Sequence, residues 1–285
     1  MKIPVDISGE TSLYGIFGYP VNHSKSPQFQ SSAFSYLNIS AVYLPFEIPP
    51  EKLEDAINAL KTLNIKGVNI TVPHKEEVVK YLDEISEEVK YIKACNTIKN
   101  IDGYLVGYNT DAYGFITGLK ELVEDLSNKT VLVLGAGGAS RAVIYSLIKE
   151  GIKKLYVANR TVERAYQILE DFRSLNRFID EILLPIPLNK IECCVLPYVD
   201  IIVNTTSVGL NENDKPLFDY SHIKPEHIVV DIIYKETPLL KAAKEKGCKW
   251  QDGLPMLLYQ GAKAFEIWTG QKAPIEIMKK ALLEE

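Results

Sequence analysis

The chain has few of the residues that mark secreted, zinc-stapled or membrane-spanning proteins. Its four cysteines form no Cys-x-x-Cys pair of the kind that binds structural zinc, and its four histidines show no ligand spacing. No apolar run approaches the ~20 residues of a membrane helix, and the first residues lack the pattern of a signal peptide. We therefore expect a cytoplasmic protein without a resident metal and without membrane contact.

An excess of positive charge is also missing. The sequence contains 32 Lys and Arg against 37 Asp and Glu, which gives a formal net charge of −5, and it has no basic tail. A surface that follows nucleic-acid phosphates is therefore not expected. With 285 residues, 46% of them hydrophobic, the chain is long enough for two domains with a substantial core.

A glycine-rich turn in mid-chain is the most specific feature present. The residues Gly135, Ala136, Gly137, Gly138 and Ala139 follow an apolar run over 131–134 and precede a helix expected over 139–150. Glycine at position 135 permits a tight turn, and glycine at 137 lets backbone N–H groups approach a pyrophosphate at the helix N-terminus. The pattern predicts a dinucleotide site, although Ser140 stands where the third glycine or alanine usually is.

The end of the next strand, expected over 155–158, indicates which dinucleotide binds. Enzymes that use NAD place an acidic residue about twenty residues after the loop, where it binds the ribose 2′-hydroxyl. Here the residues are Asn159, Arg160 and Thr161, which offer hydrogen-bond donors and a positive charge. Those groups suit a 2′-phosphate, so the sequence predicts NADP(H).

The remaining pattern alternates strands and helices and predicts an α/β protein with mostly parallel sheets. Strands are expected over 13–19, 41–47, 67–71, 201–204 and 228–231, and helices over 26–37, 51–63, 73–82, 255–269 and 274–283. A hairpin over 97–100 and 104–108 turns at Asp102 and Gly103. The segment 170–197 shows no clear period, and a domain boundary is expected near Asp111.

Polar residues follow several of these strands, where sheets of this type bind ligands. Ser24 and Ser26 follow the first strand and suit a carboxylate or a polyol, although the residues alone favour Ser26 as a helix N-cap before Pro27. Thr71 lies at the exit of the third strand. Lys75 falls in the first turn of the expected helix 73–82, where the helix dipole disfavours a cation.

Further candidate residues lie on either side of the hairpin and on a late helix. Asn96 precedes the hairpin, and Asp111 follows it, either as a helix cap or as the partner of Lys75 in a proton-transfer couple. Gln260 projects from a late helix, either toward a ligand or as a buried amide that satisfies backbone groups. Spacing alone does not decide between these alternatives.

Taken in order along the chain, these segments resemble the shikimate dehydrogenase family. The resemblance covers the motifs over 18–27, 69–75, 96–97, 109–111, 135–139, 159–161, 204–209, 231–234, 252–260 and 264–270. It implies reversible NADP(H)-dependent reduction of 3-dehydroshikimate to shikimate, a step of aromatic amino-acid biosynthesis. It also implies a substrate domain with a mixed sheet over 1–111 and 254–285, and a Rossmann-type NADP-binding domain over 112–253.

The resemblance further implies a role for each matching position. Lys75 and Asp111 are expected to be the catalytic pair. The substrate is expected to contact Ser24, Ser26 and Tyr234 through its carboxylate, and Thr71, Asn96 and Gln260 through its ring hydroxyls. The cofactor is expected to lie on Gly135, Ala136, Gly137, Gly138 and Ala139 with its pyrophosphate, on Asn159, Arg160 and Thr161 with its 2′-phosphate, and beside Ile232 and Gly253 with its nicotinamide.

The chain departs from the family pattern at two places in the substrate domain. Gln30 and Ser31 stand where the family usually carries His and Asn, and Gly261 stands where it usually carries Ala. A quinate/shikimate dehydrogenase of broader specificity is the nearest alternative function. A non-catalytic NADP-sensing module is a more distant one, and a homodimer is a possible assembly.

Overall fold

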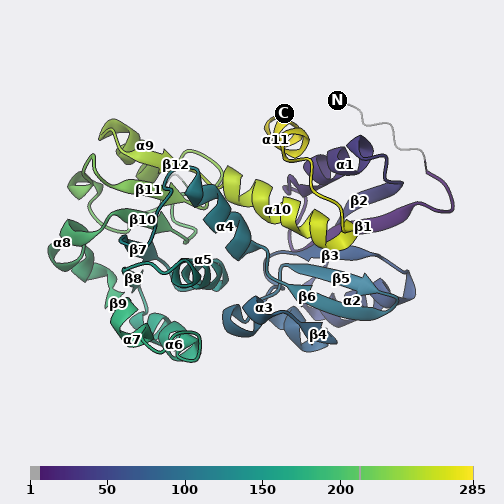
Figure 1. Cartoon of the computed structure of the whole chain (residues 1–285), viewed down its shortest axis with the longest axis horizontal. Coiled ribbons are helices and arrows are strands. Elements are labelled where there is room, and N and C mark those ends of the chain that lie inside the picture. Colours follow the sequence, from purple (N-terminus) through teal and green to yellow (C-terminus); the bar gives the residue numbers. More distant parts are fainter. Residues whose placement is uncertain (1–6, 212, 285) are drawn as a thin grey trace. The chain divides into compact units, whose positions relative to one another are not determined.

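The computed structural model describes residues 7–211 and 213–284 of the chain. The chain divides into two compact units (Figure 1). The first unit comprises Met1–Gly114 and Leu258–Glu285, and the second comprises Phe115–Leu257. The C-terminal segment therefore belongs with the N-terminal unit. Each unit is built around its own six-stranded sheet, and the α/β fold expected from the sequence is confirmed.

The first unit contains a mixed sheet with the strand order β2-β1-β3-β5-β6-β4. Its strands are β1 (Ser12–Gly18), β2 (Ala41–Glu47), β3 (Gly67–Ile70), β4 (Glu84–Ile85), β5 (Thr97–Ile101) and β6 (Tyr104–Tyr108). Strand β1 pairs parallel with β2 and β3, whereas β5 pairs antiparallel with β3 and β6. The hairpin turns at Asp102 and Gly103, whose φ angles are 51° and 95°, as the sequence predicts.

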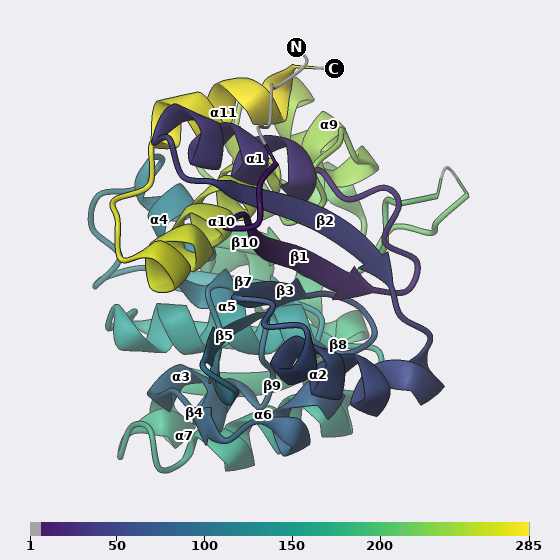
Figure 2. The same cartoon turned by 90° about the vertical axis from the view of Figure 1, so that its right-hand side faces the viewer.

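Helices cover this sheet. They are α1 (Ser26–Tyr36), α2 (Leu53–Thr62), α3 (Glu87–Ile92), the C-terminal part of α10 (Leu254–Thr269) and α11 (Ile275–Leu283), with 3₁₀ turns η1 (Pro50–Lys52) and η2 (Glu77–Tyr81). Figure 2 shows α11 beside α1. Leu53, Ile57 and Leu60 recur at helical spacing and bury one face of α2 in the core. The Trp268 indole fixes α10 by donating to the Ile98 carbonyl at 2.9 Å.

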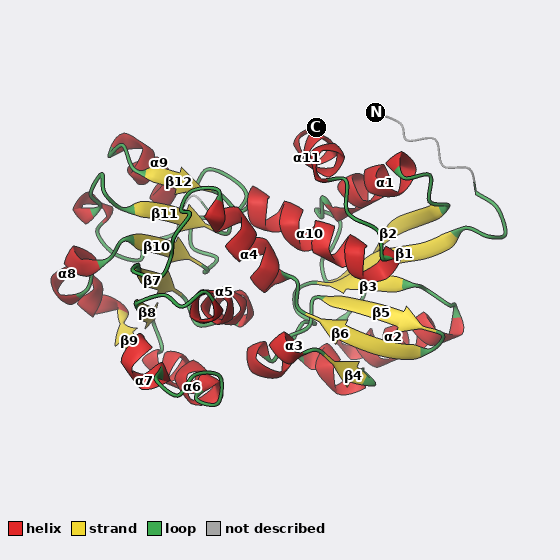
Figure 3. Ribbon diagram, in the orientation of Figure 1, coloured by secondary structure: helices red, strands yellow, loops and turns green. Residues whose placement is uncertain are grey.

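The second unit contains a fully parallel sheet with the order β12-β11-β10-β7-β8-β9 (Figure 3). Its strands are β7 (Thr130–Leu134), β8 (Lys154–Asn159), β9 (Leu183–Pro187), β10 (Ile201–Asn204), β11 (Ile228–Asp231) and β12 (Lys249–Gln251). Numbered within the unit, this is the 3-2-1-4-5-6 order of dinucleotide-binding folds. The order reverses between β7 and β10, and ligands of such sheets bind at the carboxyl ends of the strands there.

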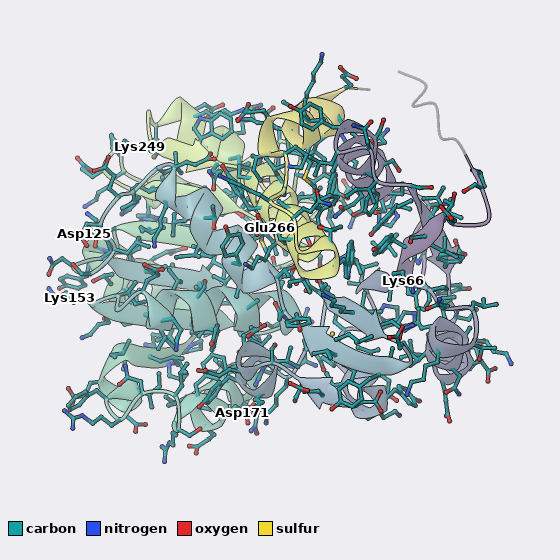
Figure 4. All side chains as sticks on the ribbon, turned by 45° about the vertical axis from the view of Figure 1, so that its right-hand side comes forward. Lys66, Asp125, Lys153, Asp171, Lys249 and Glu266 are labelled. Carbon is teal, nitrogen blue, oxygen red and sulfur yellow. The ribbon has the colours of Figure 1, made fainter. Side chains whose placement is uncertain are left out.

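The helices of the second unit are α4 (Asp111–Lys120, which begins in the first unit), α5 (Gly138–Lys149), α6 (Val162–Phe172), α7 (Ile179–Ile182), α8 (Ile191–Cys194) and α9 (Pro238–Glu245). The 3₁₀ turns η3 (Leu188–Lys190), η4 (Leu196–Tyr198) and η5 (Tyr220–His222) complete it. Arg141 of α5 forms a largely buried ion pair of 2.6 Å with Asp171 of α6, which Figure 4 labels. The segment 170–197, which has no clear hydrophobic period in the sequence, contains α7, β9, η3, α8 and the start of η4. Each of these elements is too short to give a periodic signal.

The structure corrects the helix expected over 73–82. Residues 73–76 form turns, and only η2 follows. The carbonyl of Lys75, which a continuing helix would use internally, instead accepts the N–H of Cys95 at 2.7 Å. Lys75 therefore lies in a connection after β3, and the expected conflict between its charge and a helix dipole does not arise.

The structure also corrects the capping role expected for Ser26. Helix α1 begins at Ser26 itself, and Lys25 occupies the N-cap position without a side-chain cap. The Oγ of Ser24 accepts the N–H of Ser26 at 3.2 Å, so Ser24 satisfies a backbone donor at this helix start. The Ser26 hydroxyl is not used as an N-cap.

Three remaining expectations concern absences within residues 7–211 and 213–284. No helix there is long and apolar enough to span a bilayer. The same residues contain no group of three or more His, Cys, Asp or Glu side chains placed to hold a metal ion. All four cysteines are present as free thiols.

Candidate active site and cofactor site

Lys75 and Asp111 are in direct contact in the first unit. The Nζ of Lys75 lies 2.6 Å from Oδ2 of Asp111, and the two side chains are 25% and 9% exposed. Lys75 comes from the turn after β3, whereas Asp111 is the first residue of α4. An ammonium held against a carboxylate and still partly open to solvent can exchange a proton with a substrate hydroxyl.

Asn96 holds the other oxygen of this carboxylate. Its Nδ2 donates to Oδ1 of Asp111 at 2.8 Å and to Oγ1 of Thr110 at 3.0 Å, while its Oδ1 accepts the N–H of Thr110 at 2.7 Å. Because Asp111 is held by Lys75 and Asn96, its orientation is fixed from two sides. The N–H of Asp111 is satisfied by Oδ1 of Asn109 at 3.1 Å.

Gln260 reaches the same cluster from α10. Its Oε1 lies 3.4 Å from Nδ2 of Asn96 and 3.5 Å from Oγ1 of Thr110, and the residue is 8% exposed. These contacts are long for hydrogen bonds. The structure thus brings Gln260, Asn96, Asp111 and Lys75 together from four different segments of the chain.

Thr71 directly follows β3, which pairs parallel with β1, whereas Ser24 and Ser26 come further along the chain after β1 ends at Gly18. The N–H of Thr71 donates to the Phe17 carbonyl at 2.9 Å. A Cβ at Gly18 would lie 2.3 Å from Cγ2 of Thr71, so only glycine lets the exits of β1 and β3 approach this closely. Parallel pairing thus places the exits of both strands at one edge of the sheet.

The glycine loop of the second unit has the features that a pyrophosphate requires. Gly135 has φ +112°, and a Cβ there would lie 2.7 Å from Oγ1 of Thr205. A Cβ at Gly137, the N-cap of α5, would meet no atom within 4 Å, so this side of the loop is open. The Oγ of Ser140 donates to the Gly135 carbonyl at 2.7 Å, which explains why serine is tolerated at that position. An open, backbone-lined helix start fits an anionic cofactor.

The end of β8 carries the residues predicted for a 2′-phosphate. β8 pairs parallel with β7, so Asn159 ends at the same edge of the sheet as the glycine loop. The Nδ2 of Asn159 donates to the Thr161 carbonyl at 2.8 Å, which shapes the turn, and Arg160 is exposed. An exposed guanidinium beside this turn fits a phosphate better than a bare ribose.

Ile232 and Gly253 lie against each other after β11 and β12. A Cβ at Gly253 would lie 2.0 Å from the Ile232 carbonyl oxygen, and the Gly253 N–H donates to the Ile233 carbonyl at 3.1 Å. Tyr234, two residues further along the chain than Ile232, is 40% exposed. All three belong to the second unit, whereas the other predicted substrate residues belong to the first.

Sequence reasoning missed the role of Asp231, which organises this region. Its Oδ2 accepts from Nδ2 of Asn204 at 3.0 Å and from Oγ1 of Thr237 at 2.8 Å, and its Oδ1 accepts the N–H of Ile233 at 3.0 Å. Burial raises the pKa of Asp231, while the three donors favour its carboxylate form. In the sequence, the available signal was an acid directly after the apolar run over 228–230.

The thiol beside this site, that of Cys95, is unsuited to nucleophilic chemistry. Burial raises the pKa of Cys95, which precedes Asn96, to about 12, so its thiolate is scarce at neutral pH. Contact with Cys193 raises the pKa of Cys194. Acid–base chemistry through Lys75 and Asp111 is therefore what the arrangement supports.

Three family models match successive parts of this chain. Residues 16–98 match the family model of the shikimate dehydrogenase substrate binding domain, residues 118–232 that of shikimate / quinate 5-dehydrogenase, and residues 253–283 that of the shikimate 5'-dehydrogenase C-terminal domain. Together these matches span both units.

Three relatives illustrate the similarity. The shikimate dehydrogenase (NADP(+)) of Aquifex aeolicus is 48% identical over 97% of this chain and 98% of its own length, and a crystal structure of the shikimate dehydrogenase from that organism has a TM-score of 0.91. The Thermus thermophilus shikimate 5-dehydrogenase, solved with NADP(H) and shikimate, is 35% identical with a TM-score of 0.84, covering 95% of this chain and 98% of its own.

The quinate dehydrogenase of Corynebacterium glutamicum, solved with NAD, is 30% identical with a TM-score of 0.87, covering 96% of this chain and 99% of its own. The family models and the NADP-dependent relatives confirm the resemblance inferred from the motifs. The chain belongs to the NADP⁺-dependent shikimate dehydrogenase family.

Proposed function

We propose that this chain catalyses the reversible reduction of 3-dehydroshikimate to shikimate with NADPH, and that Lys75 and Asp111 move the proton. The observation that carries the proposal is the 2.6 Å contact between Lys75 and Asp111, with Asn96 on the second carboxylate oxygen. NADPH, when bound, supplies the hydride. The chain has to supply orientation, charge and a proton.

The proton-transfer role belongs to Lys75. During reduction, its ammonium donates a proton to the oxygen of the reacting carbonyl, and in the reverse direction its amine accepts the proton from the hydroxyl. Asp111 stabilises the charged lysine and, through Asn96, stays fixed while the lysine changes its charge. Proton transfer of this kind contributes roughly 10²–10⁴-fold to the rate.

Substrate orientation is assigned to side chains at the strand ends. Ser24, Ser26 and Tyr234 bind the carboxylate, and Thr71, Asn96 and Gln260 bind the ring hydroxyls. In support, the hydroxyls of Ser24, Ser26 and Thr71 follow adjacent parallel strands, and Gln260 lies beside Asn96. Hydroxyls and amides suit a polyol, because they can both donate and accept hydrogen bonds.

Cofactor orientation is assigned to the second unit. The residues 135–139 receive the pyrophosphate, Ile232 and Gly253 lie beside the nicotinamide, and Asn159, Arg160 and Thr161 receive the 2′-phosphate. In support, the space beside Gly137 is open and Arg160 is exposed after β8. The charge of Arg160 favours NADP(H) over NAD(H).

Broader specificity, including quinate, is the second candidate. The similarity to a quinate dehydrogenase supports it, whereas Arg160 argues against the use of NAD. The decisive assay follows reduction of NADP⁺ and NAD⁺ with shikimate and with quinate, in all four pairings. Turnover confined to shikimate with NADP⁺ supports the first proposal, and activity with quinate or NAD⁺ supports the second. Binding of NADP(H) without turnover in any pairing would point to a sensing module.

A further inference from the structure

A buried tyrosine begins a chain of hydrogen bonds that leads to the Lys75–Asp111 pair. Tyr43 is on β2, and its side chain is 3% exposed. Its hydroxyl donates to Oδ1 of Asn69 on β3 at 2.7 Å, so it occupies the acceptor end of the Asn69 amide.

Asn69 continues this chain of hydrogen bonds toward the catalytic pair. Its Nδ2 donates to Oγ1 of Thr97 at 3.1 Å and to the Asn96 carbonyl at 3.2 Å. The hydroxyl of Thr97 then donates to Oδ1 of Asn96 at 3.0 Å. Since Asn69 is 4% exposed and Thr97 fully buried, water does not replace these partners readily.

Asn96 closes the relay on the acid–base pair. Its Nδ2 donates to Asp111, whose other oxygen contacts Lys75. A series of hydrogen bonds therefore joins Tyr43 to Lys75 through Asn69, Thr97, Asn96 and Asp111. Each amide in the series has a set orientation, because its donor and acceptor ends face different partners.

We propose that Tyr43 is a positioning residue, which acts through Asn69 and Asn96 to hold the Lys75–Asp111 pair in its working arrangement before substrate binds. The proposal rests on the roles assigned above to Lys75 and Asp111. Burial raises the pKa of Tyr43 well above its usual range, so the hydroxyl keeps its proton. It can then hold the Asn69 amide in one orientation at any working pH.

Replacing Tyr43 with Phe tests this role with little change in volume. The variant leaves Oδ1 of Asn69 without its donor, so the Asn69 and Asn96 amides are held less firmly. We expect kcat for shikimate oxidation to fall about five- to tenfold, as for the loss of one hydrogen bond. The KM for NADP⁺ should stay unchanged, because the relay lies wholly in the first unit.

The matched control is Tyr14→Phe. Tyr14 is also a buried tyrosine of the first unit, 7% exposed, but its ring stacks on Phe34 with centroids 4.9 Å apart and it is outside the relay. This variant should keep kcat within about twofold of the parent value. A melting temperature for each variant separates any general loss of stability from loss of positioning.

A double-mutant cycle with Thr97→Val identifies the route of action. If Tyr43 acts through Asn69 and Thr97, Tyr43→Phe should lower kcat much less in the Thr97→Val background than in the parent. Additive effects, or an unchanged kcat in Tyr43→Phe alone, would overturn the proposal. If removal of the Lys75 amine by itself leaves kcat unchanged, the assignment of Lys75 fails first, which distinguishes that failure from one of Tyr43.

A break in the middle of the relay gives a second, independent test. Thr97→Val keeps the shape but removes the hydroxyl between Asn69 and Asn96, so we expect kcat to fall about three- to tenfold with a shift in its pH profile. Thr97→Ser restores a hydroxyl and should recover most of the activity. Equal loss in both variants would show that packing, and not the hydrogen bond, matters at this position.

Discussion

The carboxylate of Asp111 contacts a donor with each of its oxygens: Oδ2 lies 2.6 Å from Nζ of Lys75 and Oδ1 lies 2.8 Å from Nδ2 of Asn96. Asn96 is in turn fixed by Thr110, whose N–H donates to its Oδ1 at 2.7 Å. A carboxylate held in this way cannot rotate toward a new partner without losing one of the two. Lys75, which is more exposed, is therefore the member of the pair that can reach a substrate.

Removal of the Lys75 amine should affect the chemical step far more than binding. Lys75→Met keeps the length of the side chain but has no proton to transfer, so we expect kcat to fall roughly 10²–10⁴-fold. The KM for shikimate should change by less than about fivefold, because the proposed carboxylate contacts remain. Steady-state kinetics in the direction of NADP⁺ reduction measures both constants.

The control for this variant is NADPH binding, followed by the change in nicotinamide fluorescence. It should match that of the parent, since residues 135–139 lie in the other unit. A variant that keeps kcat and loses only affinity for shikimate would show that Lys75 binds substrate without transferring a proton.

Two glycines of the cofactor loop should respond differently to the same substitution. Gly135→Ala places a Cβ 2.7 Å from Oγ1 of Thr205 at φ +112°, so it should lower both the melting temperature and NADPH affinity. Gly137→Ala adds a Cβ in open space and should leave the melting temperature within a few degrees of the parent value while weakening NADPH binding at least about tenfold. Normal NADPH affinity in Gly137→Ala would show that the pyrophosphate lies elsewhere.

Arg160 should determine the choice between the two nicotinamide cofactors. Arg160→Asp replaces a cation with the carboxylate that NAD enzymes place after the second strand. We expect the ratio of kcat/KM for NADP⁺ to that for NAD⁺ to fall at least about a hundredfold, as for loss of a charge-assisted phosphate contact. The exposed Arg177, on another segment, provides a charge-matched control through Arg177→Asp. Equal effects of the two variants would indicate net charge and not a local contact.

Much of the fold and of the site could be predicted because it depends on local patterns. The Gly135–Ala139 loop lies between an apolar strand and a helix, and the Asp102-Gly103 turn has positive φ angles that those residue types tolerate. Parallel strands end at the same edge of a sheet, so the residues at strand ends were expected to gather there. The contact between Lys75 and Asp111 agrees with that expectation.

The parts that could not be predicted depend on contacts between distant segments. The turn at Lys75 is stabilised by a hydrogen bond from Cys95, and no local signal marks that partner. Tyr43 resembles any core aromatic of a strand, because Asn69, its hydrogen-bond partner, is 26 residues away. Local propensity does not contain such information, and tertiary context decides the outcome.

The two departures from the family pattern in the substrate domain are in contact with each other. Gln30 of α1 is fully buried, and its Nε2 donates to the Gly261 carbonyl of α10 at 2.9 Å, so it anchors the helix that begins with Ser26. Its Oε1 has no hydrogen-bond partner among the residues that the structure describes. A Cβ at Gly261 would lie 2.3 Å from the ring of Phe29. Glycine is therefore needed for the close approach of α1 to α10.

Gly261→Ala should consequently destabilise the protein, even though alanine favours helices. The gain in helix propensity is about 1 kcal/mol, whereas overpacking a buried aromatic costs about 1–3 kcal/mol, so the unfolding free energy should fall. Because α1 carries Ser26, the KM for shikimate should rise as well. In a Phe29→Leu background, with its smaller side chain, Gly261→Ala should be neutral or stabilising. Equal destabilisation in both backgrounds, measured by thermal unfolding, would contradict this explanation.

A buried histidine should make stability depend on pH in the acid range. His227 is 4% exposed, and its Nδ1 accepts the N–H of Lys224 at 3.1 Å. Burial lowers the pKa of His227 below 6.5, its usual value, so the unfolded chain binds a proton at a higher pH than the folded one. This residue therefore contributes stability above about pH 6.5, and that contribution is lost as the pH falls toward the pKa of the folded state. His227→Gln keeps a hydrogen-bond acceptor but does not titrate. The melting temperature of the variant relative to that of the parent should therefore rise as the pH is lowered from about 7.5 to about 5. A difference that is the same at every pH in that interval would show that His227 does not titrate on unfolding.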